Sequence, residues 1–270
     1  MNNPAEILPG VIFYSYVTSM RKEKVGFIEH SSLVLQVSGQ FTLTTANEKL
    51  TLKKGEMLLI RKNQLGEITK MPLPGEQYQT ILIRLNEDLL RKIALEEQME
   101  TIEKYIGPLN LIIPGNEFLK GFFQSILPYA QHPRQQLVEA VGMLKVREAV
   151  LLLLNTMPSL KQFLFDFSEP HKIDLEKFML CNFHFNVPVE KFAQLTGRSL
   201  AGFKRDFQKT FGMPPRQWLQ EKRLAEAKYL IEEKNKKPSA IYLDLGFESL
   251  AHFSHSFKRR FGNAPTSKAG

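Results

Sequence analysis

Ser199-Leu-Ala-Gly-Phe-Lys-Arg-Asp-Phe-Gln-Lys-Thr-Phe-Gly-Met-Pro-Pro215 lines up with Ser249-Leu-Ala-His-Phe-Ser-His-Ser-Phe-Lys-Arg-Arg-Phe-Gly-Asn-Ala-Pro265, and the two stretches are copies of one pattern. Eight of the seventeen positions are identical, three of them phenylalanine. Each copy begins with a serine, whose hydroxyl can accept from the free amides of a first helical turn, and its last phenylalanine is followed by a glycine that can stop the helix. A short apolar helix and a Gly-containing turn precede each copy. The repeat therefore predicts two helix-turn-helix modules.

Each repeated helix is expected to have one apolar and one polar face. The apolar faces would be formed by Leu200, Phe203, Phe207 and Phe211 in the first copy and by Leu250, Phe253, Phe257 and Phe261 in the second. We interpret these residues as core, because apolar side chains at helical spacing are most often buried. The opposite faces are the candidates for function, and they carry Ala201, Lys204, Arg205 and Gln208 in the first copy and Ala251, Ser254, His255 and Lys258 in the second.

Positive charge is concentrated in the part of the chain that carries the repeat. Residues 1–172 contain 19 Lys and Arg against 18 Asp and Glu, whereas residues 173–270 contain 17 against 10. The net charge of +8 therefore comes almost wholly from the second segment. On a pair of helix-turn-helix modules, such a surplus is the electrostatic footprint of a surface that binds DNA phosphates.

A long helix is predicted between the two modules, which we place at about 188–211 and 238–261. It begins at Pro214 or Pro215 and ends near Asn235. At roughly 1.5 Å per residue it would span about 30 Å, which can hold the modules about one DNA turn apart. Residues 173–270 therefore predict an all-α, double helix-turn-helix domain.

The front of the chain, residues 1–165, has a different pattern. Hydrophobic residues alternate with a period of two up to about residue 85, which predicts short strands in a small antiparallel β-barrel or sandwich. The expected strands are 11–17, 33–37, 41–45, 49–52, 57–61 and 78–85. Helices follow at about 86–156, and residues 166–172 are expected to be the linker to the second domain. The predicted fold class is thus α+β with two domains.

The helices of the front domain carry caps, breaks and an apolar face. Asn86 and Asn116 are placed to cap two of them, and the second is expected to break at Pro128 and Pro133. A third should run from 134 to 156 with five apolar residues near one face, Leu137, Val138, Val141, Leu144 and Val150. We expect these helices to pair two chains in a homodimer.

One spacing pattern covers about the last hundred residues. It consists of Phe192-Ala193 through Trp218-Leu219, then Glu221-Lys-Arg-Leu224-Ala-Glu-Ala227, then Leu245-Gly-Phe247 and Phe253-x-x-x-Phe257-Lys-x-x-Phe261-Gly262-x-x-Pro265. This pattern resembles the DNA-binding domain of the AraC/XylS transcription regulators. The front of the chain is similar to the cupin-like domain and dimerisation helices of the same family.

The resemblance implies a bacterial regulator, by analogy an activator, that binds double-stranded DNA and contacts RNA polymerase. Its two recognition helices would enter successive major-groove faces on one side of the duplex, and the family's contact positions fall on the eight residues of the two polar faces. Chemically, Arg205 can pair with guanine, Gln208 with adenine, and Ala201 or Ala251 can meet a thymine methyl group. Three cations lie a turn further on and are placed for phosphates, Lys209, Arg259 and Arg260. We expect the first module to supply most of the base discrimination.

Other classes of function find little support in the sequence. A cupin-type enzyme fused to a DNA-binding tail would need metal ligands, a paired acid and base, or a nucleophile with its base. His30 is the single histidine of the strand region, and His252 and His255 have no third ligand near them, so neither a metal nor a cofactor is expected. The lone Cys181 excludes a disulfide framework, and we expect it to pack as a small apolar group. We therefore expect no enzyme.

The control of such a regulator stays open at this point. A small molecule could bind the front domain, or a protein partner alone could gate the regulator, and the sequence does not choose between them. The start of the chain is charged and contains proline rather than a secretory leader, and no apolar run is long enough to span a bilayer. We therefore expect a cytoplasmic protein that makes no membrane contact.

Overall fold

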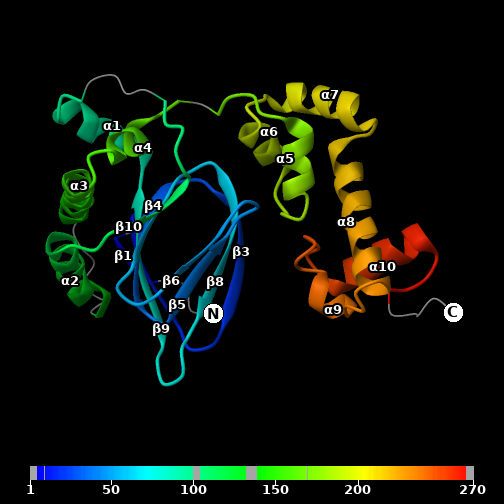
Figure 1. The fold of residues 1–270 in the computed structure, drawn as a ribbon, viewed down its shortest axis with the longest axis horizontal. Helices are drawn as coiled ribbons and strands as arrows, with labels where there is room; N and C mark the ends of the chain where they lie inside the picture. Colours follow the sequence, from blue (N-terminus) through cyan, green and yellow to red (C-terminus); the bar gives the residue numbers. More distant parts are fainter. Residues whose placement is uncertain (1–4, 9, 100–103, 132–138, 169, 266–270) are drawn as a thin grey trace. The chain divides into compact units, whose positions relative to one another are not determined.

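The structure is a computed structural model that describes residues 5–8, 10–99, 104–131, 139–168 and 170–265 (Figure 1). The chain divides into two compact units, Met1–Ser168 and Glu169–Gly270, and the boundary falls within the segment expected as the linker. Unit 1 combines strands with helices, and the described part of unit 2 is built from helices. The predicted two-domain α+β fold is confirmed.

The strands of unit 1 are antiparallel and lie in two sheets (Figure 1). The six-stranded sheet has the order β1 (Ala5–Leu8), β2 (Ile12–Val17), β9 (Tyr78–Leu85), β4 (Ser31–Ser38), β7 (Met57–Ile60) and β10 (Asn110–Ile113). The four-stranded sheet has the order β3 (Arg21–Ile28), β8 (Gln64–Met71), β5 (Gln40–Thr44) and β6 (Lys49–Leu52). Since the described strands are hydrogen-bonded within these two sheets, closure into one cupin-like barrel stays a prediction.

Successive residues of the central strands point into two different cores. Leu33 on β4 and Leu59 on β7 pack in the cluster that includes the helices of unit 1, whereas Val34 and Leu58 pack with residues of the four-stranded sheet. All four side chains are fully buried. Because both faces of the six-stranded sheet are covered, a strand such as β7 is apolar at every position.

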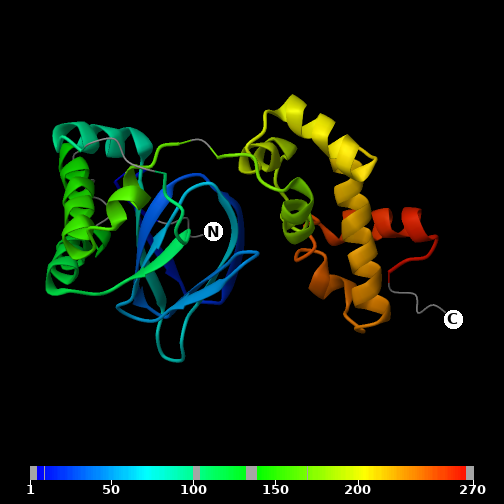
Figure 2. The ribbon, with the colours of Figure 1, turned by 45° about the horizontal axis from the view of Figure 1, so that its top comes forward.

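Four helices cover one face of the six-stranded sheet (Figures 1 and 2), namely α1 (Glu87–Glu96), α2 (Glu117–Gln131), α3 (Glu139–Thr156) and α4 (Leu160–Phe165). The predicted caps are present. The Asn86 side chain accepts from the backbone N–H of Asp88, and the Asn116 side chain accepts from that of Leu119, each at 2.8 Å. Each asparagine thereby satisfies an amide that has no partner inside its helix.

The expected break at Pro128 is wrong, because α2 continues through this residue to Gln131. Four side chains of α2 are buried in the core, Leu119, Phe122, Phe123 and Ile126. At about 1.5–3 kcal/mol for each buried side chain, their burial outweighs the roughly 3 kcal/mol cost of an interior proline. Pro133, the other expected break, lies outside the described residues.

The predicted apolar face of α3 is divided between the core and the surface. Val150 is buried together with Val146, whereas Val141 and Leu144 are 36% and 65% exposed. The core therefore takes a different stripe of the helix from the one expected. Residues 134–138, which include Leu137 and Val138, lie outside the described part of the chain.

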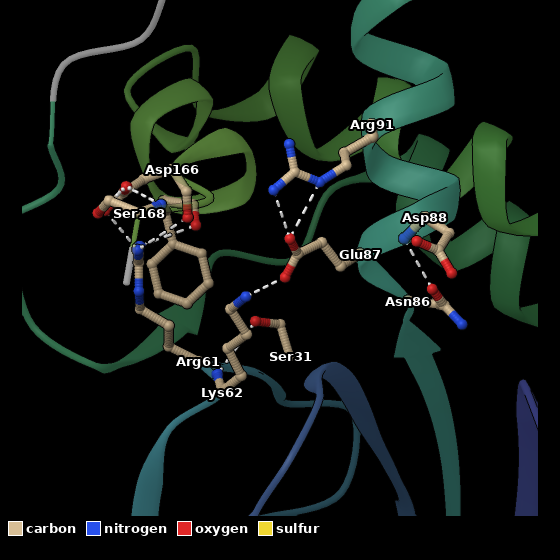
Figure 3. Close-up of polar contacts among 10 residues, drawn as sticks. Ser31, Arg61, Lys62, Asn86, Glu87, Asp88, Arg91, Asp166 and Ser168 are labelled. Atoms are coloured by element: carbon tan, nitrogen blue, oxygen red, sulfur yellow. Dashed lines mark hydrogen bonds and ion pairs between the residues drawn. The ribbon is translucent and has the colours of Figure 1, made fainter. Parts of the chain in front are cut away.

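Unit 1 ends in a polar cluster around Arg61 (Figure 3). The Arg61 guanidinium follows β7 and donates to the carbonyl oxygen of Phe163 at 2.9 Å and to the carboxylate of Asp166 at 2.7 Å. The Asp166 carboxylate also accepts from the backbone N–H of Ser168 at 3.0 Å. The segment that leaves α4 is thus attached to the six-stranded sheet.

A second set of ion pairs joins this end of the sheet to α1 (Figure 3). Glu87, the first residue of α1, binds both Lys62 and Arg91. The Arg91 guanidinium in turn lies 4.2 Å from the ring centre of Phe167. Sheet, helix and the end of unit 1 therefore meet at one place.

Unit 2 contains α5 (Leu175–Asn182), α6 (Val189–Leu195), α7 (Leu200–Phe211), α8 (Pro215–Glu232), α9 (Pro238–Ile241) and α10 (Leu250–Phe261). Asp174 caps α5 by accepting from the backbone N–H of Lys177 at 2.8 Å. Among the described residues, none of the helices combines the length and apolar character needed to cross a bilayer.

Candidate nucleic-acid interface

The first helix-turn-helix module consists of α6, a turn at Thr196 and Gly197, and α7. The hydroxyl of Ser199 accepts from the backbone N–H of Gly202 at 3.2 Å and so caps α7. Gly212 ends the helix with φ +71°, a left-handed conformation that glycine adopts at low cost. Both ends of α7 are therefore determined by the predicted residues.

The second module repeats this geometry with α9 and α10. Ser249 accepts from the backbone N–H of His252 at 3.2 Å, and Gly262 ends α10 with φ +84°. The difference lies in the preceding helix, because α9 has four residues whereas α6 has seven. The repeated sequence thus produces repeated caps.

The phenylalanine faces form the cores of the modules. Phe203 and Phe207 are fully buried, and Phe253 and Phe257 are 0% and 5% exposed. Leu250 was expected in the core, but it is 39% exposed. Leu250 is the first residue of α10 and lies about one helical turn before Phe253, whose ring contacts that of Phe257.

The eleven residues predicted to contact DNA lie on the surface. Ten are exposed, namely Ala201, Lys204, Arg205, Gln208, Lys209, Ala251, His255, Lys258, Arg259 and Arg260. Ser254 is partly buried. The polar faces of both helices are therefore accessible from outside the module cores.

Helix α8 contributes to the core of both modules. Near its start, Trp218 contacts the rings of Phe207 and Phe211, with centroids 5.6 and 4.6 Å apart. Further along, Leu224 and Ala227 are buried in the cluster that contains the phenylalanines of α10. The 18 residues of α8 span about 27 Å.

Arg198 and Asp206 form an ion pair that the sequence did not indicate. Nε of Arg198 lies 3.0 Å from a carboxylate oxygen of Asp206, and its Nη1 donates to the carbonyl oxygens of Ile173 and Thr196. The hydrogen bond from Arg198 lowers the pKa of Asp206, which stays ionised on α7. The ion pair holds the negative charge of Asp206 next to Arg198. Through its hydrogen bond to Ile173, Arg198 also connects the start of unit 2 to α7.

Arg216 extends the candidate interface beyond the predicted residues. It is exposed in the first turn of α8 and lines a cavity of about 520 Å³ together with Lys204 and Gln208 of α7. The sequence signal that could have identified it is a cation directly after the Pro-Pro pair that begins α8. Its position adds positive charge beside the exposed face of the first module.

His30, His252, His255 and Cys181 are the remaining candidates from the sequence. In the parts of the chain that the structure describes, no three His, Cys, Asp or Glu side chains are grouped so as to hold a metal ion. Cys181 is exposed, so the expectation that it packs as an apolar group is wrong. Helix α5 instead buries Leu175, Met179 and Asn182, and Cys181 lies on a different side of the helix.

The structure thus defines a protein with two helix-turn-helix modules joined by one helix, which follow a strand-rich domain in the sequence. A family model described as a helix-turn-helix domain matches residues 192–268, and one described as the ExsA N-terminal regulatory domain matches residues 31–164. The chain belongs to the AraC/XylS family of transcription regulators.

Curated relatives extend this similarity over most of the chain. The thermoregulatory protein LcrF of Yersinia pestis and the virulence regulon transcriptional activator VirF of Yersinia enterocolitica are each 26% identical over 252 residues, 88% of this chain and 89% of theirs. The transcriptional regulator ExsA of Pseudomonas aeruginosa is 24% identical over 237 residues, 85% of this chain and 82% of its own length. The chain is therefore a DNA-binding transcription regulator and not an enzyme.

Proposed function

We propose that the protein activates transcription by placing α7 and α10 in successive major grooves on one side of a DNA duplex. Once bound to this DNA, it contacts RNA polymerase. The observation that carries the proposal is the shared geometry of the two helices. Both have Ser and Gly caps, both bury phenylalanines against α8, and both expose cationic faces. The length of α8, about 27 Å, is of the order of one DNA turn of about 34 Å. Activation is supported by the relative VirF, which is described as an activator.

The two modules are proposed to contribute differently. On α7, Arg205 can donate two hydrogen bonds to guanine and Gln208 can pair with adenine, whereas the face of α10 offers Ser254 and His255. Bidentate pairs discriminate between bases by about 1–3 kcal/mol each. The first module would therefore supply most of the base discrimination, and the second would mainly bind the backbone.

Cations beside these faces are proposed to bind phosphates. Lys209 is in the last turn of α7, and Arg259 and Arg260 are in the last turn of α10. Arg216 joins them as the fourth cation. Contacts of this kind fix the orientation of the protein on the duplex and make its affinity depend on salt.

We propose that α3 pairs two copies of the chain. Val141, Leu144 and Leu151 are 36%, 65% and 36% exposed, at spacings of three and seven residues along one helix. Such spacing puts the three side chains near one face, as in the seam of paired helices. An exposed apolar stripe of this kind is stabilised when a second copy covers it.

Control by a small molecule is supported by a cavity of about 220 Å³ in unit 1. Its apolar lining includes Ile28 and Leu82, and its polar lining includes His30, Ser32 and Arg84. Ligand pockets usually measure about 300–1,000 Å³, so an effector here would be a compact molecule. A thermal-shift screen separates this proposal from gating by a protein partner alone, because a bound metabolite raises the melting temperature at saturation.

The experiment that tests the DNA-binding proposal is selection of duplex sites from random sequence with the purified chain. The proposal expects two sequence blocks about one helical turn apart, with more information under α7 than under α10. Equal information under both helices would refute the division of roles. If the purified chain binds no duplex even at low salt, the proposed interface itself is refuted.

A further inference from the structure

One partly buried arginine connects the segment before the first helix-turn-helix module to the second module. Arg223 lies midway along α8, and its guanidinium donates to three backbone carbonyl oxygens. Nε binds the oxygen of Phe183 and Nη2 that of Phe185, both at 2.8 Å, while Nη1 binds that of Gly246 at 3.2 Å. The first two acceptors belong to the segment between α5 and α6, and the third belongs to the turn before α10. A single planar group therefore joins the segment that leads into the first module to the turn of the second.

The environment of Arg223 favours a fixed geometry. Burial lowers the pKa of its guanidinium to about 10, so it remains charged at neutral pH. The three acceptors are main-chain oxygens, whose positions are set by the fold and not by side-chain rotamers. A guanidinium also presents its donors in a rigid plane, unlike an ammonium group. Its hydrogen bonds consequently specify the angle between the modules as well as their distance.

Two other contacts bring the same segments together. Gly246 has φ +82°, and a Cβ atom there would lie 2.5 Å from the carbonyl oxygen of His184. The backbone of the second module is thus packed directly on that of the segment that leads into the first. Nearby, the Asn186 amide donates to the carboxylate of Glu248 at 3.1 Å. We call these contacts, together with Arg223, the module junction; it joins residues 183–186 to residues 246–248.

A small movement at the module junction would change the position of a recognition helix by about one base pair. Helix α10 starts four residues after Gly246, and its 12 residues span about 18 Å. A rotation of about 10° at its start moves its far end by about 3 Å, close to the 3.4 Å rise of one base pair. Helix α8 alone fixes the distance between the modules but not this rotation.

We infer that Arg223 is a positioning residue that fixes the spacing and phase of the two DNA sequence blocks that the protein accepts. The inference rests on the proposed function, in which both modules enter the major groove. It assigns the tolerance for half-site spacing to a side chain that lies partly buried at the module junction and not among the residues proposed to contact DNA. Loss of Arg223 should therefore relax spacing without changing which bases each module prefers.

The test measures affinity for a set of duplexes in which the two selected blocks are separated by the preferred spacing or by one or two base pairs more or fewer. Wild-type protein should bind the shifted sites about tenfold or more weakly than the preferred site. Arg223→Met keeps the apolar stem, removes all donors, and should reduce this penalty to about threefold or less. Arg223→Lys, which keeps the charge but not the fork, should give an intermediate profile.

Lys234→Met is the matched control, since it also removes one positive charge. Lys234 follows the end of α8, and its ammonium group lies over the ring of Tyr229, a residue of α8. It should weaken all spacings equally. If Arg223→Met does not fold, Asn186→Ala tests the module junction at an exposed hydrogen bond and should broaden the profile to a smaller degree. An Arg223→Met or Asn186→Ala protein that keeps the wild-type spacing profile overturns the inference. A wild-type protein with no spacing preference instead overturns the proposed two-module binding.

Discussion

Arg61 and Asp166 form an ion pair, with 2.7 Å between Nη2 and Oδ2, although they are 105 residues apart in the sequence (Figure 3). Their side chains are only 12% and 5% exposed. The carboxylate of Asp166 uses both oxygens, since Oδ2 also accepts from the backbone N–H of Tyr105 and Oδ1 from that of Ser168. The pair therefore closes the end of unit 1 onto the six-stranded sheet.

Asp166→Asn should destabilise unit 1 by about 3 kcal/mol, because it leaves the guanidinium of Arg61 buried without its counter-charge. Urea unfolding of the full chain provides a measurement for each unit. Trp218 is the single tryptophan, so its fluorescence follows unit 2, whereas far-UV circular dichroism follows both units. The dichroism transition of the variant should begin at lower urea while the fluorescence transition stays in place. A parallel shift of both signals would contradict the assignment to unit 1.

The contribution of Asp166 should also depend on pH. Burial by itself would raise its pKa, but hydrogen bonds from Ser168 and Tyr105 and the charge of Arg61 together lower it. A carboxyl group whose folded pKa is lowered stabilises the fold above its unfolded pKa of about 3.9, and this stability is lost as the pH falls through the folded value. The difference in unfolding free energy between wild type and Asp166→Asn should thus be constant from pH 6 to 7 and shrink below about pH 4. A difference that persists unchanged into stronger acid would rule out this charge effect.

Arg205→Ala and Arg260→Ala should weaken DNA binding in different ways. Loss of Arg205 is expected to cost about 1–3 kcal/mol at one base position and to relax the preference there. Loss of Arg260 is expected to weaken all sequences evenly and to reduce the dependence of log affinity on log salt concentration by about one phosphate contact. Binding to a panel of singly substituted sites at several salt concentrations separates the two effects. The same profile from both variants would show that Arg205 does not read a base.

Ser199→Ala and Ser249→Ala should loosen one recognition helix each. Both hydroxyls accept a backbone N–H at 3.2 Å, and removal of an N-cap costs about 1 kcal/mol. Amide hydrogen exchange in the first turns should accelerate about fivefold, in α7 for the first variant and in α10 for the second. Each variant is the control for the other. Equal acceleration of both helices in either variant would mean that the modules open together.

Local sequence signals predicted those features whose cause is local. The caps at Asn86, Asn116, Ser199 and Ser249 were predictable because a side chain binds an amide two or three residues away. The exposed faces of α7 and α10 followed in the same way from helical periodicity. Strand β10 was not predicted, because its four residues become a strand only by pairing with the edge of β7, about fifty residues earlier in the chain.

Contacts between distant segments were the part that the sequence could not predict. Strand β8 contains Glu67 and Lys70 and lacks a clear period of two, yet it is held between β3 and β5. In the candidate interface, the exposed residues were predictable, but the Arg198–Asp206 pair and the three carbonyl partners of Arg223 were not. Their partners come together only when separate helices pack, so no spacing in the chain identifies them.

Leu144→Glu should weaken self-association of the chain. Leu144 is 65% exposed on α3, in the stripe with Val141 and Leu151 that we propose as the dimer contact. A carboxylate there would be buried against an apolar surface and would meet its own copy across a two-fold interface, which disfavours the dimer. Sedimentation equilibrium should give a dissociation constant at least about tenfold higher than that of wild type, a change of about 1.4 kcal/mol.

Leu73→Glu is the matched control for this variant, because Leu73 is an exposed leucine, 42% accessible, in the turn between β8 and β9. It should sediment as wild type does, so a change specific to Leu144 locates the contact on α3. Binding to a single selected site should be retained by both variants, since Leu144 and Leu73 lie in unit 1 whereas α7 and α10 lie in unit 2. If Leu144→Glu associates as strongly as wild type, the stripe on α3 is not the surface that joins two chains.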